Sequence, residues 1–527
     1  MARICILLLS CLSLLRPQTG PLSGLDEYVA RGMKTFDVPG VAVAVVQNGE
    51  VALAKGYGVR RMDEPARVDE HTLFGIASNT KAFTTAALAI LVDEGKLNWD
   101  DPVIGHLEWF QMYDPYVTHE ITIRDLLTHR SGMGLGEGDL LFFPPSTYTR
   151  DEILHRLRFM KPASSFRSHY AYDNLLYLAA GQIIPAVTGQ QWEDFIRERI
   201  FRPLGMSYSN TSVAGYRPGD NFATPHSEVE GKLTPLAPAR IDNTAPAGAI
   251  NSSVSDMAKW VTVQLNGGAI PGAEQKRLFS ERQSKEMWSP QTILRTPDPP
   301  PALAALRTDF AAYGLGWVLR EYRGHKMVSH TGGLPGYVSQ VALIPDMKLA
   351  VIVLTNQESQ GMFSSVTYRI LDNYMNAPGA DWLKAFQDRT QQQREQADEA
   401  VKKAASARAA DSKPSLPLEK YAGHYTDPWY GDILIDIDRG KLVMRFSHSP
   451  ALTGDLEHWQ YDTFKARWRD RSLAADAFVT FALNADGAIR QVNMIPVSPQ
   501  TDFSFDFQDL LLTPVVSKPA NPGDQKK

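Results

Sequence analysis

The ten residues GIASNTKAFT (75–84) place Ser78 three positions before Lys81, at the start of a predicted helix. Apolar residues recur after it at helical spacing, and Gly95 stands where a helix commonly ends. Either Ser78 is a helix cap beside a surface lysine, or it is a nucleophile and Lys81 its base. Residues at i and i+3 share one helix face, so the amine can point at the hydroxyl. No other serine of this chain begins an S-x-x-K pattern, and this one stands at the start of a predicted buried helix. Both observations favour the interpretation of Ser78 as a nucleophile.

A serine hydroxyl is a weak nucleophile without a base in reach, so a second proton-transfer group is expected elsewhere in the chain. Tyr-x-Asn occurs three times, beginning at Tyr172, Tyr208 and Tyr374. The first lies in a polar loop, FRSHYAYDN (166–174), directly before a predicted buried helix. We therefore predict that Tyr172 and Asn174 face the cleft.

A third element is the run His330, Thr331, Gly332 and Gly333, at the entry to the predicted edge of a sheet. Glycines there allow a substrate backbone to lie against the strand. We predict that His330, Thr331 and Gly332 contact the substrate, although His330 could instead fill the cleft wall. The backbone N–H groups of Ser78 and Gly333 are the predicted oxyanion donors.

The order of predicted elements indicates an α/β (α+β) domain over residues 25–378. Residues 39–60 alternate around Asn48-Gly49, which predicts a β-hairpin. Several helices follow, one of them capped by Ser255, and then two strands within 338–357 and a helix from about Met362 to Met375. This order predicts an antiparallel sheet assembled from both ends of the domain, flanked by helices, with a helical lobe between.

The last third of the chain changes in texture. Residues 379–415 are polar and rich in alanine, which predicts a solvated helix and a linker. Residues 416–516 contain short alternating segments separated by Gly, Asp and Asn, which predict a small all-β barrel domain. Residues 517–527 form a predicted disordered tail.

Residues 1–24 are a predicted signal peptide, with Arg3 followed by an apolar stretch too short to span a membrane. We therefore expect an exported protein, periplasmic or extracellular, with no stable membrane span after signal removal. Cys5 and Cys11 both lie in this segment, so the mature chain would carry no thiol.

The net charge of −5 and the lack of a basic stripe make nucleic acid an unexpected partner. The histidine spacing and the glycine patterns predict no metal and no cofactor.

Eight segments, in order along the chain, resemble the penicillin-recognising serine hydrolases over residues 26–375. They are PGVAVAVVQNGE, LFGIASNTKAFT, LNWDDPV, LLTHRSGMG, FRSHYAYDN, IFRPLGMS, YGLGW and SHTGGLPGY. The chain looks most similar to the class C β-lactamase branch, with its D-stereospecific peptidases, D-aminopeptidases and family VIII esterases. Residues 456–468, LEHWQYDTFKARW, resemble the lipocalin-like β domain that follows some of these hydrolases.

The resemblance implies a β-lactamase/transpeptidase-like fold in which Ser78 is the nucleophile and Lys81 and Tyr172 share proton transfer. Asn174 would bind the acyl-side amide of the substrate, and Ser78 and Gly333 would form the oxyanion hole. Whether Lys81 or Tyr172 is the base stays open. The chain departs from the family's β-lactamases at His330, where those enzymes usually carry lysine; histidine is mostly neutral at pH 7 and holds an anion weakly.

These observations predict an exported serine hydrolase that cleaves an amide or ester bond of a small-molecule or peptide substrate through an acyl-enzyme on Ser78. It would resemble a D-aminopeptidase or an esterase. One alternative is a β-lactamase or D,D-peptidase that acts on β-lactams or cell-wall peptides. Another, of a different class, is a non-catalytic sensor that binds penicillin or peptides.

Overall fold

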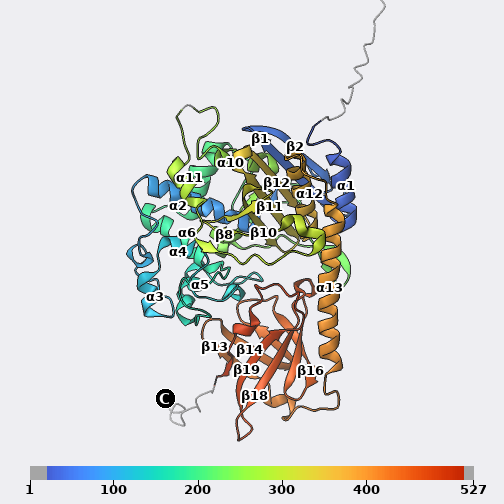
Figure 1. Cartoon of the computed structure of the whole chain (residues 1–527). Helices are drawn as coiled ribbons and strands as arrows, with labels where there is room; N and C mark the ends of the chain where they lie inside the picture. Colours follow the sequence, from blue (N-terminus) through green and yellow to red (C-terminus); the bar gives the residue numbers. More distant parts are fainter. Residues whose placement is uncertain (1–19, 274, 516–527) are drawn as a thin grey trace, which may run out of the picture.

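The computed structural model describes residues 20–273 and 275–515. Most of the predicted signal peptide, with both cysteines, and the predicted tail at 517–527 lie outside the described residues. In the described part of the chain, every helix is too short or too polar to cross a membrane. The chain forms a sheet-and-helix domain and a smaller barrel, with one long helix beside both (Figure 1).

An eight-stranded antiparallel sheet forms the centre of the first domain, and it is assembled from both ends of that domain as predicted. The predicted hairpin is confirmed, since Asn48 and Gly49 have φ angles of 53° and 82°, the positive values that a tight hairpin turn requires. The first strand of this hairpin pairs with the last strand of the domain, and Val41 lies opposite Thr355. The order across the sheet is β2 (Glu50–Gly58), β1 (Gly40–Gln47), β12 (Leu349–Thr355), β11 (Tyr337–Ile344), β10 (His325–Leu334), β9 (Val318–Tyr322), β8 (Ala311–Tyr313) and β7 (Thr292–Ile293).

Both faces of this sheet are buried. Along β1, Val41, Val43 and Val45 pack into one core, whereas Ala42 and Ala44 pack into the other, as the two-residue period of a strand requires. Helices α1 (Leu25–Phe36) and α12 (Gln360–Tyr374) cover the valine side, and α10 (Val254–Leu265) covers the other. The cap of α10 is Ser253, whose hydroxyl accepts the N–H of Asp256. The predicted cap, Ser255, was therefore wrong by two residues.

The chain between β2 and β7 forms a helical lobe, as predicted, and this lobe holds the buried helix α2 (Thr80–Asp93). Two small two-stranded sheets accompany it, β3 (Phe74–Gly75) with β6 (Asn251–Ser252) and β4 (His226–Val229) with β5 (Lys232–Pro235). The other helices of the lobe are α3 (Pro115–Glu120), α4 (Ile123–Leu126), α5 (Arg150–Arg156), α6 (Leu175–Thr188), α7 (Trp192–Ile196), α8 (Arg202–Leu204), α9 (Ala245–Gly248) and α11 (Glu281–Met287).

The second domain is a nearly closed eight-stranded antiparallel barrel, which confirms the predicted all-β module. Its two ends meet where Val492 and Leu512 exchange both backbone hydrogen bonds. Its order is β19 (Ile489–Pro496), β18 (Ala477–Leu483), β17 (Thr463–Trp468), β16 (Thr453–Gln460), β15 (Lys441–Phe446), β14 (Gly431–Asp438), β13 (Gly423–Asp427) and β20 (Thr513–Pro514).

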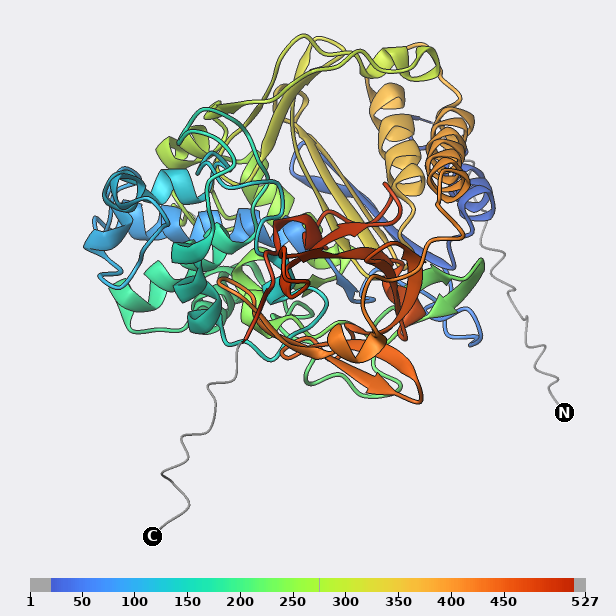
Figure 2. The ribbon, with the colours of Figure 1, turned by 90° about the horizontal axis from the view of Figure 1, so that it is seen from below.

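Helix α13 (Trp382–Ser406) connects the domains, and the barrel also contacts the first domain directly. The first turns of α13 are buried through Trp382 and Phe386, and only the later turns are mostly exposed. Arg156 donates to the Trp429 carbonyl oxygen at 2.7 Å. Tyr148 stacks on His448 with ring centroids 3.8 Å apart. Figure 2 shows the barrel lying across one end of the first domain, over both the sheet and the helical lobe.

Candidate active site

Ser78 lies in a single 3₁₀ turn, Ala77–Asn79, between the short strand β3 and helix α2. It is not the helix cap, because Asn79 occupies that position. Ala77 has a φ angle of 48°, in the left-handed region that residues with a Cβ atom rarely adopt, and such strain is often found at active sites. Asn79 Nδ2 donates to Ser339 Oγ at 2.8 Å and so ties the turn to β11. The fold therefore presents Ser78, partly exposed, on a turn held against the sheet.

Lys81 is fully buried directly behind Ser78. Its Nζ donates to Ser78 Oγ at 3.1 Å, to Asn174 Oδ1 at 2.7 Å and to the Ala247 carbonyl oxygen at 3.0 Å. Burial lowers the pKa of the Lys81 amine to about 7, against the attraction of two nearby carboxylates. A neutral amine keeps two N–H groups for Asn174 and Ala247 and offers its lone pair to the Ser78 hydroxyl. The geometry therefore suits proton transfer from Ser78 to Lys81 near neutral pH.

Tyr172 lies on the polar loop before α6, with the Lys81 Nζ 4.8 Å from the centre of its ring. Burial raises the pKa of the Tyr172 phenol well above 10, and a hydrogen bond with Ser78 acts in the opposite direction. The phenol is therefore protonated at neutral pH, so it can donate a proton or pass one on. The sequence placed Tyr172 near Ser78 and Lys81, and the structure brings the three side chains together.

His129 contacts the loop that carries Tyr172. Its ring packs against the Tyr172 ring at a tilt of 34°, with centroids 4.3 Å apart, and its Nδ1 accepts the backbone N–H of Asp173 at 3.0 Å. Burial lowers the pKa of His129 well below 6.5, so the ring stays neutral. Since Nδ1 is the acceptor, the proton is on Nε2. His129 therefore orders the loop through packing and a backbone hydrogen bond.

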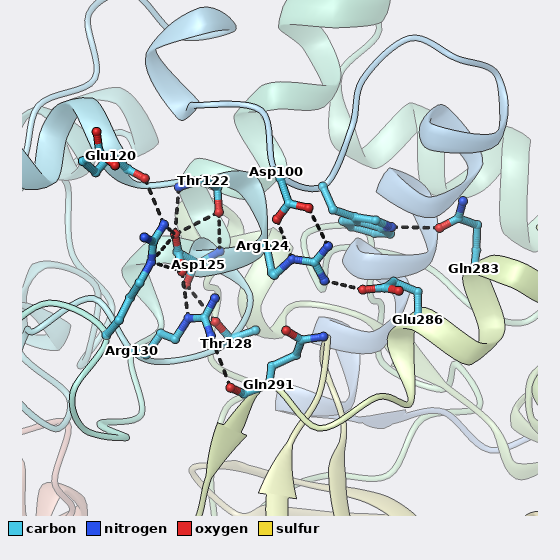
Figure 3. A network of polar contacts seen from close by, with 12 residues as sticks. Asp100, Glu120, Thr122, Arg124, Asp125, Thr128, Arg130, Gln283, Glu286 and Gln291 are labelled. Atoms are coloured by element: carbon cyan, nitrogen blue, oxygen red, sulfur yellow. Dashed lines mark hydrogen bonds and ion pairs between the residues drawn. The ribbon is translucent and has the colours of Figure 1, made fainter.

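An ion network centred on the buried carboxylate of Asp125, in helix α4, anchors the same loop (Figure 3). The Asp125 side chain is fully buried and bonds Arg130 at 2.7 Å and Arg167 at 2.6 Å. Arg130 directly follows His129, and Arg167 lies five residues before Tyr172. One carboxylate thus joins the two loops that carry the aromatic side chains of the site.

The side-chain amide of Asn174 faces inward. Its Oδ1 accepts from Lys81, and its Nδ2 donates to Asp139 Oδ2 at 2.8 Å. Asp139 is fully buried, and burial raises the pKa of its carboxyl to about 7. The sequence analysis missed Asp139, which stands in the run GEGDLL with no motif to mark it.

Strand β10 brings the third predicted element next to Ser78. A Cβ atom on Gly332 would lie 2.2 Å from the Ile76 carbonyl oxygen, so only glycine allows this close approach. Pairing of β10 with β9 ends at Ser329, whereas pairing with β11 continues to Leu334. In the described chain, the β9 side of residues 331–333 is therefore not covered by a strand.

His330 is buried with both ring nitrogens bonded inside the protein. Its Nδ1 contacts the Thr331 carbonyl oxygen at 2.6 Å, and its Nε2 contacts the Tyr313 hydroxyl at 3.0 Å. The carbonyl can only accept, so Nδ1 carries the proton and Nε2 accepts from Tyr313. Burial lowers the pKa of His330 to about 3, so this residue carries no charge at neutral pH. Thr331 and Gly333 are exposed beside it.

Family models match both domains. The model described as beta-lactamase matches residues 25–374, and one described as a domain of unknown function, DUF3471, matches residues 407–514. Unguisins hydrolase ungD' of Aspergillus campestris is 32% identical over 440 residues, which cover 79% of this chain and 78% of that protein. Unguisins hydrolase ungD of Aspergillus violaceofuscus is 29% identical over 510 residues, covering 90% and 88%.

Two solved structures are similar over most of their length. The D-amino acid amidase from Ochrobactrum anthropi SV3, complexed with L-phenylalanine amide, is 25% identical with a TM-score of 0.54, covering 67% of this chain and 96% of that chain. The octameric penicillin-binding protein homologue from Pyrococcus abyssi has a TM-score of 0.58 at 21% identity, covering 93% and 98%. The second likeness concerns the fold alone.

Proposed function

We propose a function for a chain that belongs to the beta-lactamase family of serine hydrolases: it cleaves an amide or ester bond of a small molecule or peptide through an acyl-enzyme on Ser78. The observation that carries this proposal is the buried Lys81 amine, 3.1 Å from Ser78 Oγ and with its pKa lowered to about 7. A buried lysine poised near neutral pH is costly to keep and is typical of a proton-transfer group.

In the proposed acylation, the neutral Lys81 amine takes the Ser78 proton as Oγ bonds to the substrate carbonyl carbon. The carbonyl electron pair moves to oxygen, where the N–H groups of Ser78 and Gly333 stabilise it. The intermediate then expels the amine or alcohol. The leaving group takes the phenolic proton of Tyr172, and Lys81 returns a proton to Tyr172.

Deacylation follows the same route in reverse. Water gives a proton to Lys81 through Tyr172 as its oxygen bonds to the acyl carbon, and Ser78 leaves with a proton. In this series of steps Lys81 is the base and Tyr172 passes protons between Lys81 and the leaving group or water, because the phenol is protonated at rest. Working through Tyr172 in both steps is the class C pattern.

We propose an amide as the favoured substrate, in the manner of a D-aminopeptidase, with an ester as second choice. The similar proteins carry the names hydrolase and amidase. The uncharged His330, bonded on both nitrogens, is a poor anchor for a substrate carboxylate, which disfavours β-lactams and D-Ala-D-Ala termini. The exposed Thr331 on the β10 edge would line the acyl side, whereas Gly332 is buried against Ile76 and the Asn174 amide is already bonded to Lys81 and Asp139. The apolar segment after Arg3 supports export.

The test is intact-mass spectrometry of the protein after a fluorophosphonate probe and, separately, after a penicillin, with Ser78→Ala as control. We expect one fluorophosphonate adduct on Ser78, none in the variant, and no penicilloyl adduct. Turnover of D- and L-amino acid amides, aryl esters and a chromogenic cephalosporin then ranks the substrate classes. A penicilloyl adduct would favour the β-lactamase or D,D-peptidase alternative, and no adduct with either reagent would favour the binding protein.

A further inference from the structure

The barrel domain extends into the active-site region through the segment between β19 and β20. The Asp506 carboxylate is fully buried and accepts the backbone N–H groups of Gly138 at 2.6 Å and Leu140 at 3.0 Å. Phe505 packs on Phe143 with ring centroids 5.1 Å apart. These contacts fix the barrel segment against the loop that carries Asp139.

Ser504, directly before Phe505 and Asp506 in the sequence, bonds directly to Asp139. Its Oγ donates to Asp139 Oδ2 at 2.8 Å, the same oxygen that accepts from Asn174. Asn174 in turn accepts from Lys81 at 2.7 Å, and Lys81 donates to Ser78. Four consecutive hydrogen bonds therefore connect a residue of the barrel to the nucleophile. Ser504, Asp139, Asn174 and Lys81 are each less than one tenth exposed.

We propose that Ser504 is a positioning residue of the active site, which acts through Asp139 and Asn174 to hold Lys81 against Ser78. Asp139 Oδ2 is the acceptor that fixes the direction of the Asn174 amide, and this direction presents Oδ1 to Lys81. In a buried network, loss of one partner leaves the others unsatisfied and free to rearrange. The catalytic centre is then completed by the second domain. This inference rests on the proposed function, in which Lys81 activates Ser78.

The same bonds connect Ser504 to the protonation of Lys81. Burial raises the pKa of Asp139, and the hydrogen bonds from Ser504 and Asn174 oppose this rise. Without the Ser504 hydroxyl, the pKa of Asp139 rises further and the carboxyl spends more of its time neutral. A neutral Asp139 no longer attracts the Lys81 ammonium, so the pKa of Lys81 falls. The other titratable groups that influence Lys81 or Asp139 are Asp173, Tyr172, His129, His330, Asp502 and Asp506.

The experiment measures the rate of fluorophosphonate labelling at Ser78 between pH 5 and pH 9, in the full chain. In Ser504→Ala we expect the plateau rate to fall about 10- to 100-fold, as a small misplacement of a catalytic group does, and the acid limb to move to lower pH. Ser504→Thr keeps the hydroxyl and should restore most of the rate and the original limb. Ser498→Ala lies on the same segment, where the Ser498 hydroxyl accepts the Gln500 N–H, and it should behave as the wild type.

A Ser504→Ala protein with wild-type plateau and wild-type limb would overturn the inference. A thermal unfolding transition close to that of the wild type shows that a variant is folded. In a folded variant, slower labelling with a shifted acid limb then reports a misplaced Lys81. If wild-type Ser78 is not labelled, the proposed function fails, and ¹⁵N NMR titration of the Lys81 amine still decides the inference. A lower Lys81 pKa in Ser504→Ala than in wild type supports positioning; equal values overturn it.

Discussion

Gly332 approaches Ile76 so closely that a Cβ at position 332 would lie 2.2 Å from the Ile76 carbonyl oxygen and 2.9 Å from the Ala77 Cβ. Because Ala77 precedes the nucleophile, Gly332→Ala should push the turn that carries Ser78 away from β10. We expect a loss of about 1–3 kcal/mol of stability, typical of overpacking, and slower labelling of Ser78.

Gly333→Ala is the matched variant for stability, since a Cβ there meets nothing within 4 Å. Its urea-unfolding midpoint should equal that of the wild type, whereas the midpoint of Gly332→Ala should fall. Equal midpoints for the two variants would show that β10 and the Ser78 turn are not packed as closely as the structure places them.

The acid limb of activity should report the ionisation of Lys81. The amine must be neutral to accept the Ser78 proton, and its pKa is lowered to about 7. Below pH 7 the labelling rate should therefore fall about tenfold per pH unit, and above pH 8 it should level off. Lys81→Arg keeps a cation that cannot lose its proton, so labelling should be lost across the range. A rate that is flat from pH 5 to pH 8 would contradict Lys81 as the base.

Local patterns predicted the elements whose chemistry is local. Asn48-Gly49 specifies a turn of positive φ, and the three-residue spacing of S-x-x-K lets the Lys81 amine reach the Ser78 hydroxyl, although Ser78 lies in the 3₁₀ turn before α2 and not in the helix itself. The boundary of α10 was missed because Ser253 and Ser255 are both competent caps, and the helix begins after the first.

The rest of the site depends on tertiary contacts. Asp139 and Ser504 are 365 residues apart and belong to different domains, so spacing could not join them. The partner of His330, Tyr313, is on another strand, and only the assembled sheet shows that both ring nitrogens of His330 are bonded within the protein. Sequence could name the nucleophile and its neighbours along the chain, but not the buried acid that orients them.

Phe503 should limit the size of the substrates that reach Ser78. Its ring meets the ring of Tyr172 edge-on at 6.1 Å, and 41% of the residue is exposed. Phe503→Ala should raise kcat/KM for bulky amides relative to small ones by about tenfold, mainly through KM, because it removes a wall and leaves the proton-transfer groups in place. Leu434→Ala, on the barrel strand β14 and 45% exposed, serves as control and should leave the ratio unchanged. An unchanged ratio in Phe503→Ala would place the substrate on another side of Tyr172.

Asp125 should contribute far more stability than Asp100, although both carboxylates bind arginine in the same region (Figure 3). The Asp125 side chain is fully buried between Arg130 and Arg167, whereas the Asp100 side chain is 70% exposed beside Arg124. Removing the buried carboxylate leaves two arginines without their shared partner, and water can reach Arg130 (18% exposed) and Arg167 (39% exposed) only in part. Asp125→Ala should therefore cost up to about 3 kcal/mol, and Asp100→Ala less than about 1 kcal/mol.

The pH dependence of stability gives an independent check on Asp125. Burial alone would raise the pKa of this carboxyl, but the hydrogen bonds from Arg167, the Thr122 N–H and Arg130 together hold it below 3.8. Since the folded-state pKa lies below the unfolded value, Asp125 stabilises the protein fully above about pH 4, and its contribution disappears as the pH falls through the folded pKa. Urea unfolding at pH 7 and below pH 4 should therefore show the difference between wild type and Asp125→Asn shrinking in acid. A difference that stays constant would mean that the carboxylate charge does not hold the Tyr172 loop in place.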